Sequence, residues 1–289
     1  MEGDDSLRPM PPLPSFDLVV ATVDRVEPLE RLLASLDRQT HRSFRVLLVD
    51  QNEHERLEPV LAGHSGLDVV GLRSPRGLSR ARNVALAQLE ADVVAFPDDD
   101  CEYPDDLLER VGERFAARPE LDGLSARAEG RDGRSSESWA HDPAVLTREN
   151  VWNRGISFGI FLRRELVERV GRFDEQLGLG AGTPWSSGEE IDFLIRAVTG
   201  GGRVEYDPGL VVLHEEKSPS PEELRAFGRR DGASVGYLLR RHGYPLGTRA
   251  RMLVRPLGGA AVALAHRDRA RAAFHLATLR GRVAGLRSG

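Results

Sequence analysis

Three consecutive carboxylates, Asp98, Asp99 and Asp100, follow an apolar stretch at residues 92–97 that is typical of a buried strand. Adjacent like charges repel one another, so such a triplet is tolerable on a solvated turn or where a cation neutralises it. The triplet alone leaves both interpretations open. It is either a polar turn that leads into the next helix or part of a metal site.

Other charged residues follow other predicted strands. Buried strands are predicted at 16–23 and 44–49, and they end at Asp24-Arg25 and at Asp50. Because the carboxyl ends of parallel strands share one edge of a sheet, we expect these acids to converge there. Arg80 and Arg82 lie in the first turns of a helix predicted at about 78–89, where an anion would be favoured; the alternative is a solvated helix face. Acids and arginines at one edge suit a phosphate ligand bridged by a divalent metal.

The elements that must position these residues alternate along the chain. Further strands are predicted at 67–72 and 156–162, with helices between the strands, which indicates an α/β fold with a doubly wound, mostly parallel sheet. We expect 123–148 to be a polar loop, 177–188 a Gly/Ser-rich loop, and 203–213 one or two strands. The GLGAGT stretch lacks the spacing of a dinucleotide-binding fingerprint.

Composition excludes several classes of protein. The chain has 289 residues, 40% hydrophobic and 29% charged, which is ordinary for a globular protein. Its single cysteine, Cys101, excludes an internal disulfide and a cysteine-based zinc site. No apolar run reaches 18 residues and no secretory signal is visible, so we expect a cytoplasmic protein. Residues 1–15, rich in proline and acids, are expected to be a disordered lead-in.

Charge is unevenly distributed. The formal net charge is −5, yet residues 240–289 contain eleven arginines against one acid, Asp268, and carry +10, while 1–239 carry −15. The 240–289 tail is expected to face an anionic membrane surface or the acidic body. Within it, apolar residues spaced by four and three positions from Ala272 to Leu286 predict a helix that packs on the protein or contacts a membrane or a partner. No nucleic-acid-binding motif accompanies the arginines, so nucleic acid is not expected as a partner.

Four blocks in order resemble glycosyltransferase family 2, whose members have the GT-A fold. They are FDLVVATVDR, VLLVDQN, GLSRARNVALAQLEADVVAFPDDDC, and the long block from Gly171 to Glu215 that contains the acid pair Glu189-Glu190 and ends in His214-Glu215. The resemblance covers roughly 16–214. Two departures stand out. Ala21-Thr22-Val23-Asp24-Arg25 replaces the usual P-T-Y-N-R, and Glu189-Glu190 replaces the usual Glu-Asp, which keeps a carboxylate base.

The resemblance assigns roles to particular residues. It implies a Mn²⁺ or Mg²⁺ ion held by Asp98, Asp100 and His214. The residues implied to bind the nucleotide sugar are Thr22, Asp24, Arg25, Asp50, Arg80, Arg82, Asp98 and Asp99. Glu190 is the expected general base, with Glu189 as the fallback, and Trp185 and Asp192 are expected on the acceptor side.

Simpler structural roles compete with three of these assignments. Ser187 and Glu190 fit the spacing of a capping box, in which Glu190 would only satisfy the start of a helix. His214 could be a hydrogen-bonded surface histidine. Trp185 could be a plain core anchor rather than a stacking surface for a sugar.

The prediction is therefore a GT-A domain at 16–218, with a nucleotide-binding half at 16–101 and an acceptor half at 102–218, followed by a basic helical C-terminal extension at 219–289. We expect an inverting, metal-dependent glycosyltransferase that moves a sugar from a UDP, GDP or dTDP donor to a hydroxyl of a glycan, a glycolipid or a small molecule. The expected location is the cytoplasm or the inner face of the cell membrane, and a homodimer is left open. The alternatives are a sugar nucleotidyltransferase and a non-catalytic relative that binds nucleotide sugars or glycans.

Overall fold

The computed structural model describes residues 12–133, 139–214 and 219–288, and it divides the chain into two compact units. The described part of the first, the sheet unit, comprises residues 12–74, 82–172 and 193–214. The described part of the second unit, which we call the bundle unit, comprises residues 75–81, 173–192 and 219–288. This division differs from the predicted domain boundary at residue 218, because 173–192 cluster with the C-terminal helices.

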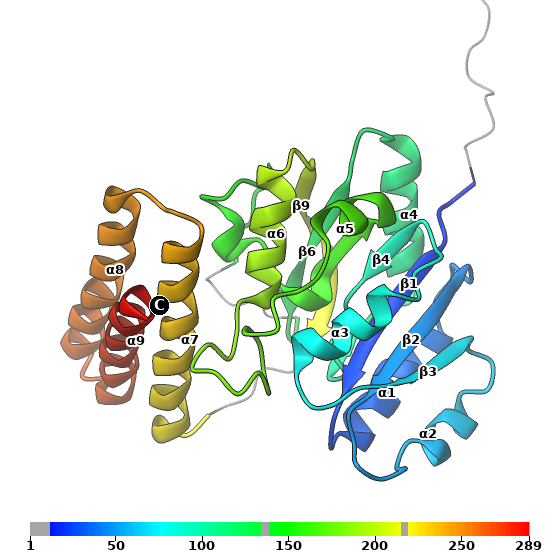
Figure 1. Ribbon diagram of the computed structural model, residues 1–289, viewed down its shortest axis with the longest axis horizontal. Coiled ribbons are helices and arrows are strands. Elements are labelled where there is room, and N and C mark those ends of the chain that lie inside the picture. The colour runs from blue at the N-terminus through cyan, green and yellow to red at the C-terminus, as the bar shows by residue number, and fades with distance from the viewer. Residues whose placement is uncertain (1–11, 134–138, 215–218, 289) are drawn as a thin grey trace, which may run out of the picture. The chain divides into compact units, whose positions relative to one another are not determined.

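One sheet organises the sheet unit, and within the described residues its order is β3-β2-β1-β4-β8-β6-β9-β5, with β7 paired to β9 (Figure 1). The strands are β1 (Phe16–Thr22), β2 (Phe44–Asp50), β3 (Val69–Arg73), β4 (Val93–Ala95), β5 (Cys101–Glu102), β6 (Gly123–Glu129), β7 (Ala144–Val145), β8 (Ile160–Arg163) and β9 (Val204–His214). Pairs β1–β2, β2–β3, β1–β4 and β6–β9 are parallel and contain most of the paired residues. Strand β8 is antiparallel to both β4 and β6. The predicted α/β sheet is confirmed.

Helices lie on both faces of this sheet (Figure 1). One face packs against α1 (Val26–Asp37), α2 (Glu58–Gly63) and α4 (Leu107–Ala117), whose buried leucines, valines and Phe115 share a core with alternate residues of β1 and β2. Because strand side chains alternate between faces, Val19 and Leu47 point to the opposite face. Helix α5 (Arg164–Val170) packs against β4 and β8. Helices α3 (Leu78–Leu86) and α6 (Glu189–Thr199) contribute residues to both units.

The prediction that 123–148 is a loop is wrong at β6, which lies in the interior of the sheet between β8 and β9. Its sequence, GLSARAE, has small residues in place of the large aliphatic side chains that reveal a strand. Gly123 is required, because a Cβ there would lie 2.5 Å from Leu162. The buried Ser125 hydroxyl donates to the carbonyl of Arg154, so a polar residue is accommodated in the sheet. The strand predicted at 156–162 begins later, at Ile160, after a 3₁₀ turn (Ser157–Gly159).

The C-terminal extension is helical as predicted and forms a three-helix bundle of α7 (Pro221–Arg241), α8 (Leu246–Ala265) and α9 (Arg269–Arg287). A capping box starts α7, since Ser220 Oγ accepts from the Glu223 amide and Glu223 accepts from the Ser220 amide. Glycines let α7 and α9 approach closely. A Cβ on Gly232 would lie 2.4 Å from the Thr278 carbonyl oxygen, and one on Gly285 would lie 2.0 Å from that of Ala233.

This packing bears on the apolar stripe predicted from Ala272 to Leu286. Ala272 is buried, and Leu279, Val283 and Leu286 are partly buried within a helix that packs along α7 and α8, whereas Leu276 of the same stripe is 40% exposed. Most of the stripe therefore packs on the protein itself. No helix in the described part of the chain is long and apolar enough to cross a membrane.

Candidate active site

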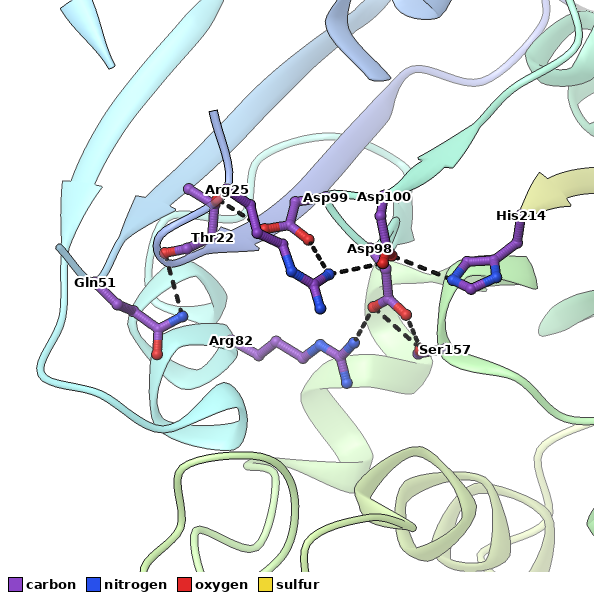
Figure 2. Close-up of polar contacts among 9 residues, drawn as sticks. All are labelled: Thr22, Arg25, Gln51, Arg82, Asp98, Asp99, Asp100, Ser157 and His214. Carbon is purple, nitrogen blue, oxygen red and sulfur yellow. Dashed lines mark hydrogen bonds and ion pairs between the residues drawn. The ribbon is translucent and has the colours of Figure 1, made fainter. Parts of the chain in front are cut away.

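The acidic triplet lies beyond the carboxyl ends of two neighbouring parallel strands. β4 pairs with β1, and Asp98 extends this pairing through an isolated bridge to Ala21. The turn that carries the triplet is closed by the Cys101 amide, which donates to the Asp98 carbonyl. This register brings the triplet beside Thr22, the last residue of β1, and beside Arg25, three residues further on (Figure 2).

Asp99 is the buried member of the triplet, at 5% exposure. Its Oδ2 accepts from Thr22 Oγ1 at 2.7 Å, and its Oδ1 accepts from Arg25 Nη1 at 2.8 Å. Burial raises the pKa of Asp99, although the hydrogen bond from Thr22 and the charge of Arg25 oppose that rise. Asp99 is thus held in place by two neighbours rather than open to solvent.

Arg25 joins two members of the triplet. Its Nη1 lies 2.8 Å from Asp99 Oδ1 and 2.8 Å from Asp100 Oδ2. Burial lowers the pKa of Arg25, but the charges of Asp99 and Asp100 outweigh it and the net shift is upward. Arg25 is the residue that precedes the first turn of α1, so the loop after β1 determines its position. One guanidinium therefore offsets the repulsion between two adjacent carboxylates.

Asp98 contacts a buried arginine and a serine. Arg82 is 1% exposed, and its Nη2 donates to Asp98 Oδ1 at 3.0 Å, while its guanidinium carbon lies 5.9 Å from the centre of the Phe96 ring. Ser157 Oγ donates to Asp98 at 3.2 Å. The sequence did not indicate Ser157, because a serine inside an apolar stretch has no spacing that would distinguish it.

His214 reaches the triplet from the far end of β9. Strand β5 pairs with β9 in a register that puts Cys101 opposite His214, and His214 Nε2 lies 3.2 Å from Asp100 Oδ1. The imidazole stacks on Phe158, with ring centroids 4.9 Å apart and an interplanar angle of 2°. This contact confines the ring to an orientation that faces the carboxylate.

Two donor atoms at this edge, Asp100 Oδ1 and His214 Nε2, lie at the spacing of metal ligands. Neighbouring ligands of an octahedral Mg²⁺ ion with bonds of about 2.0–2.1 Å lie roughly 3 Å apart, which matches the separation of Asp100 Oδ1 and His214 Nε2. Imidazole and carboxylate ligands also suit Mn²⁺. Within residues 12–133, 139–214 and 219–288, however, no group of three acidic, histidine or cysteine side chains is arranged to hold a metal. Arg25 and Arg82 contact the carboxylates instead.

The remaining residues predicted to bind the donor in this unit lie at the ends of β1 and β2. Asp50 Oδ1 accepts from the side chain of Asn52 at 2.7 Å, and its Oδ2 lies 2.5 Å from Arg73 Nη1. Asp24 has a left-handed backbone, with φ of 57°, and its amide donates to Asn52 Oδ1 at 2.7 Å. Asn52 therefore links the two loops. Sequence reasoning gave no role to Asn52, two residues after Asp50, or to Arg73, which directly follows the strand predicted at 67–72.

The other predicted site residues belong to the bundle unit. Arg80 Nε lies 3.3 Å from the Glu175 carboxylate, whereas Arg82 pairs with Asp98. The two arginines were predicted to act together, but each contacts a different acid. Trp185 stacks on Tyr237 of α7, with centroids 3.9 Å apart and an interplanar angle of 20°. A helix of the C-terminal extension thus covers one face of the predicted sugar-stacking residue.

Asp192 is fully buried and binds the end of α7. Its Oδ1 accepts from His242 Nε2 at 2.8 Å and from Arg241 Nε at 3.3 Å. Arg241 also lies 3.3 Å from Asp174. Neither Arg241 nor His242 was predicted, because they lie in the part of the chain interpreted as a basic extension. Arg241 and His242 therefore fix the carboxylate of Asp192 in place.

The start of α6 tests whether Glu190, of the acid pair Glu189-Glu190, is the capping residue of that helix. The first intrahelical bond runs from the Asp192 amide to the Gly188 carbonyl, which makes Gly188 the N-cap residue. Ser187 lies one position earlier, and its hydroxyl donates to Asp231 at 3.0 Å. Ser187 is therefore not the N-cap of α6, and the capping-box interpretation of Glu190 is wrong. Glu189 is buried and Glu190 is partly exposed.

A family model described as "Glycosyl transferase family 2" matches residues 17–170 of the chain, which is more than half of its length. The chain belongs to glycosyl transferase family 2. The matched range contains the triplet, Arg25, Asp50 and Arg82, and it ends before the Glu189-Glu190 pair. The family predicted from the sequence is confirmed, and with it the class of enzyme to which that family belongs.

Curated relatives of this family 2 chain include the pre-mycofactocin glycosyltransferase of Mycobacterium tuberculosis, which is 26% identical over 242 residues covering 78% of this chain and 47% of that protein. The chain thus spans about half the length of that relative. The succinoglycan biosynthesis protein ExoM of Rhizobium meliloti is 26% identical over 238 residues, covering 78% of this chain and 75% of that protein.

Solved structures share the fold of this family 2 protein. The mannosyltransferase PcManGT from Pyrobaculum calidifontis, in complex with GDP-Man and Mn²⁺, aligns with a TM-score of 0.65 and 19% identity, covering 98% of this chain and 90% of that one. TarS residues 1–349 from S. aureus, in complex with UDP-GlcNAc, aligns with a TM-score of 0.63 and 18% identity, covering 92% and 90%. The predicted GT-A type of fold is confirmed.

Proposed function

We propose that the chain transfers a sugar from a nucleoside diphosphate sugar to an acceptor hydroxyl, with inversion at the anomeric carbon and with a divalent metal. The observation that carries this proposal is the grouping of Asp98, Asp99 and Asp100 with Arg25, Arg82 and His214 at the carboxyl ends of β1 and β4. Acids, arginines and an imidazole at one edge of a parallel sheet suit a diphosphate and its counter-ion.

Asp98, Asp100 and His214 would hold the metal, Mn²⁺ or Mg²⁺. When bound, the ion supplies Lewis-acid stabilisation of the charge that develops on a departing diphosphate. Arg25 and Arg82 contribute fixed positive charge beside the carboxylates, and Arg82 is buried, so its charge is poorly screened. Asp99, fixed by Thr22 and Arg25, is proposed to face the ribose or the sugar of the donor.

The nucleobase is proposed to lie beyond β2. Asp50 ends that strand and would accept from a ring N–H of the base, while Asn52 and Arg73 orient its carboxylate. Asp24 belongs to the same loop system through Asn52. Arg80 remains a proposed donor-binding residue. The donor nucleotide is proposed to be UDP, GDP or dTDP, in keeping with the nucleotide sugars bound to the two structural neighbours.

Transfer also needs a base that removes the proton of the acceptor hydroxyl. We propose Glu190 for this role, with Glu189 as the fallback, because the capping alternative for Glu190 does not hold. A single displacement assisted by one base inverts the configuration of the anomeric carbon. Trp185, stacked on Tyr237, and Asp192 are proposed to shape the acceptor side.

The acceptor is proposed to be a glycan, a glycolipid or a small molecule that offers a hydroxyl. The proposed location is the cytoplasm, at the inner face of the cell membrane, where lipid-linked acceptors are accessible. The net charge of +10 on residues 240–289 supports this location.

The decisive experiment is a donor panel. Thermal unfolding of the full chain is recorded with UDP-, GDP- and dTDP-sugars, each with and without Mn²⁺, and release of the nucleoside diphosphate is followed by chromatography. We expect one nucleotide to raise the unfolding temperature only with Mn²⁺ and to be released on incubation with an acceptor. Absence of both effects for every donor would refute the proposal. A product with retained anomeric configuration would refute the single displacement.

A further inference from the structure

Helix α8 has an exposed apolar side, which we call the α8 face. It consists of Leu246, Ala250, Val254, Leu257, Ala261 and Leu264, at successive spacings of four, four, three, four and three residues. These spacings place all six side chains on one side of a helix. The four larger side chains are well exposed: Leu246 by 81%, Val254 by 61%, Leu257 by 46% and Leu264 by 58%. Ala250 and Ala261 are exposed as well.

A neighbouring side of α8 is packed against α9. Pro256, Ala260 and Ala263 are buried, and the space above Gly259 is occupied by the His275 ring of α9. Because Pro256 has no N–H, it leaves the Met252 carbonyl without its helical partner. Arg282 Nη1 of α9 donates to that carbonyl. The orientation of α8 is therefore fixed by α9, and the α8 face stays exposed as a consequence.

The charges around the α8 face have one sign. Helix α8 contains no aspartate or glutamate, and its arginines are Arg249, Arg251 and Arg255. At about 100° per residue, the exposed Arg251 lies about 60° beyond Val254, and the exposed Arg255 lies about 100° beyond it, with Val262, 61% exposed, between the two arginines. Arg249 falls instead between Pro256 and Ala260 on the packed side of the helix, and its Nε is buried. Beyond the helix, Arg267 and Arg269 are exposed as well. The acid between them, Asp268, accepts from the Arg271 amide at the start of α9.

An apolar stripe with exposed arginines along one side has a specific chemical complement. Contiguous exposed apolar residues on a globular protein mark an interaction site. Arginine side chains can lay their methylene stems along an apolar surface while the guanidinium reaches polar groups beside it. A lipid bilayer offers both parts of this complement, an apolar interior and a plane of phosphates above it. A second copy of the chain would add its own Arg251 and Arg255 to a surface that is already positive, and this repulsion disfavours pairing of two α8 faces.

We propose that the α8 face is a membrane-binding surface for bilayers that contain anionic lipids. Helix α8 lies parallel to the bilayer surface, with the α8 face at the boundary between headgroups and acyl chains and its arginines on lipid phosphates. This proposal names a different surface from the Ala272–Leu286 stripe of α9, which packs mostly inside the bundle. It does not depend on the proposed transferase activity, since binding to vesicles is measured without any donor or acceptor.

The test is co-sedimentation of the full chain with vesicles. One set is pure phosphatidylcholine, and the other contains equal parts of phosphatidylcholine and phosphatidylglycerol. We expect binding to the anionic set only, weakening steeply as the ionic strength rises above about 0.15 M. The variant V254Q/L257Q should bind about tenfold or more weakly, because two exposed aliphatic side chains no longer enter the bilayer. Its unfolding temperature should match that of the unaltered chain, because both positions are exposed.

Two further variants separate the contributions. R251Q/R255Q should bind anionic vesicles several-fold more weakly, with a shallower dependence on salt. Val145→Gln is the matched control, since Val145 is 49% exposed and lies in β7 of the other unit; it should bind as the unaltered chain does.

Three results would overturn the proposal. The first is equal binding to neutral and anionic vesicles, or binding to neither. The second is unchanged binding by V254Q/L257Q. The third is concentration-dependent dimerisation in analytical ultracentrifugation that V254Q/L257Q abolishes, without vesicle binding by the unaltered chain. That last result would assign the α8 face to contacts between copies of the chain.

Discussion

Oδ1 of Asp100 lies 3.2 Å from Nε2 of His214, although 114 positions separate the two residues in the chain. The pairing of β5 with β9 creates this contact, because it sets Cys101 opposite His214. The carboxylate and the imidazole therefore face one another through backbone register and not through a flexible loop. The proposed metal site would therefore take the spacing of these two ligands from the register of the strands.

We expect Asp100→Asn and His214→Ala each to weaken the response to Mn²⁺. Asp100→Asn removes the negative charge of one proposed ligand and His214→Ala removes the other ligand, so the Mn²⁺ concentration that gives half of the thermal stabilisation should rise at least tenfold. The measurement is a Mn²⁺ titration of the unfolding temperature with a saturating nucleotide sugar. Asp105→Asn is the control, because Asp105 pairs with Arg38 on an exposed surface. Unchanged titrations in both variants would place the metal elsewhere.

Replacement of Glu190 by glutamine should separate binding from chemistry. Loss of the base should reduce turnover by at least about a hundredfold, while the affinity for the donor and the unfolding temperature stay as they were. Stability should change little because glutamine has the same size as glutamate and position 190 is partly exposed. The measurements are turnover, donor-dependent thermal shift and unfolding temperature, with the exposed Glu222→Gln of α7 as control. Full activity of Glu190→Gln together with an inactive Glu189→Gln would assign the base to Glu189.

The sequence predicted the site in the sheet unit better than the site in the bundle unit. Arg25, Arg82 and the triplet could be placed together because each follows a strand or starts a helix in a recognisable alternating pattern. Ser157 could not, because nothing in its neighbours marks a serine that donates to Asp98. Strand β6 was missed because small residues replace the aliphatic ones that normally reveal a buried strand.

The packing of the bundle unit could not be predicted, because its polar contacts join residue types that are also common on solvated surfaces. Ser187 and Asp231, which are 44 positions apart, form a hydrogen bond that no spacing rule identifies. The arginines of the extension were interpreted together as one basic surface. Arg241 instead binds Asp192 and Asp174, while Arg251 and Arg255 are exposed. Only tertiary packing separates these two groups.

Asp192 should be needed for stability. Asp192→Leu leaves His242 and Arg241 without their shared acceptor, and we expect the free energy of unfolding to fall by roughly 1–3 kcal/mol. Urea unfolding measures the change, and a double-mutant cycle with His242→Gln should show that the two losses are not additive. His266→Gln, at an exposed position beyond α8, is the control. Strict additivity would mean that the two side chains do not interact.

The glycines between α7 and α9 should be intolerant of alanine. A Cβ on Gly232 would lie 2.4 Å from a backbone oxygen, so the helices would have to separate, and Gly232→Ala should destabilise the chain by about 1–3 kcal/mol. Gly258→Ala in α8 is a matched control, because nothing lies within 4 Å of its Cβ position. Higher helix propensity should leave that variant unchanged or about 0.5–1 kcal/mol more stable. Equal effects of the two substitutions in thermal unfolding would contradict the close packing.

Acid should destabilise the chain partly through His275. Burial and the charges of Arg271 and Arg282 lower its pKa below the ordinary value of about 6.5. The folded chain therefore binds this proton less readily than the unfolded chain does. The contribution of neutral His275 to the free energy of unfolding is therefore fully present above the ordinary pKa of histidine. It is lost as the pH falls through the lower pKa of His275 in the folded chain.

Unfolding temperatures measured between about pH 7 and pH 5 test this expectation. The stability advantage of the unaltered chain over His275→Gln should shrink as the pH falls, whereas His266→Gln should follow the unaltered chain throughout. Parallel curves for the unaltered chain and His275→Gln would show that this histidine does not titrate in a buried setting.

Two contacts limit where the chain can be truncated. Trp185 stacks on Tyr237, and Asp192 is buried against Arg241 and His242. A chain cut after residue 218 would keep Trp185 and Asp192 but lose the partners that α7 supplies to both. Its loop at 173–192 would be an early target for proteases. The C-terminal helices are therefore not a detachable module: they could not be swapped between homologous proteins without the 173–192 segment that packs on them.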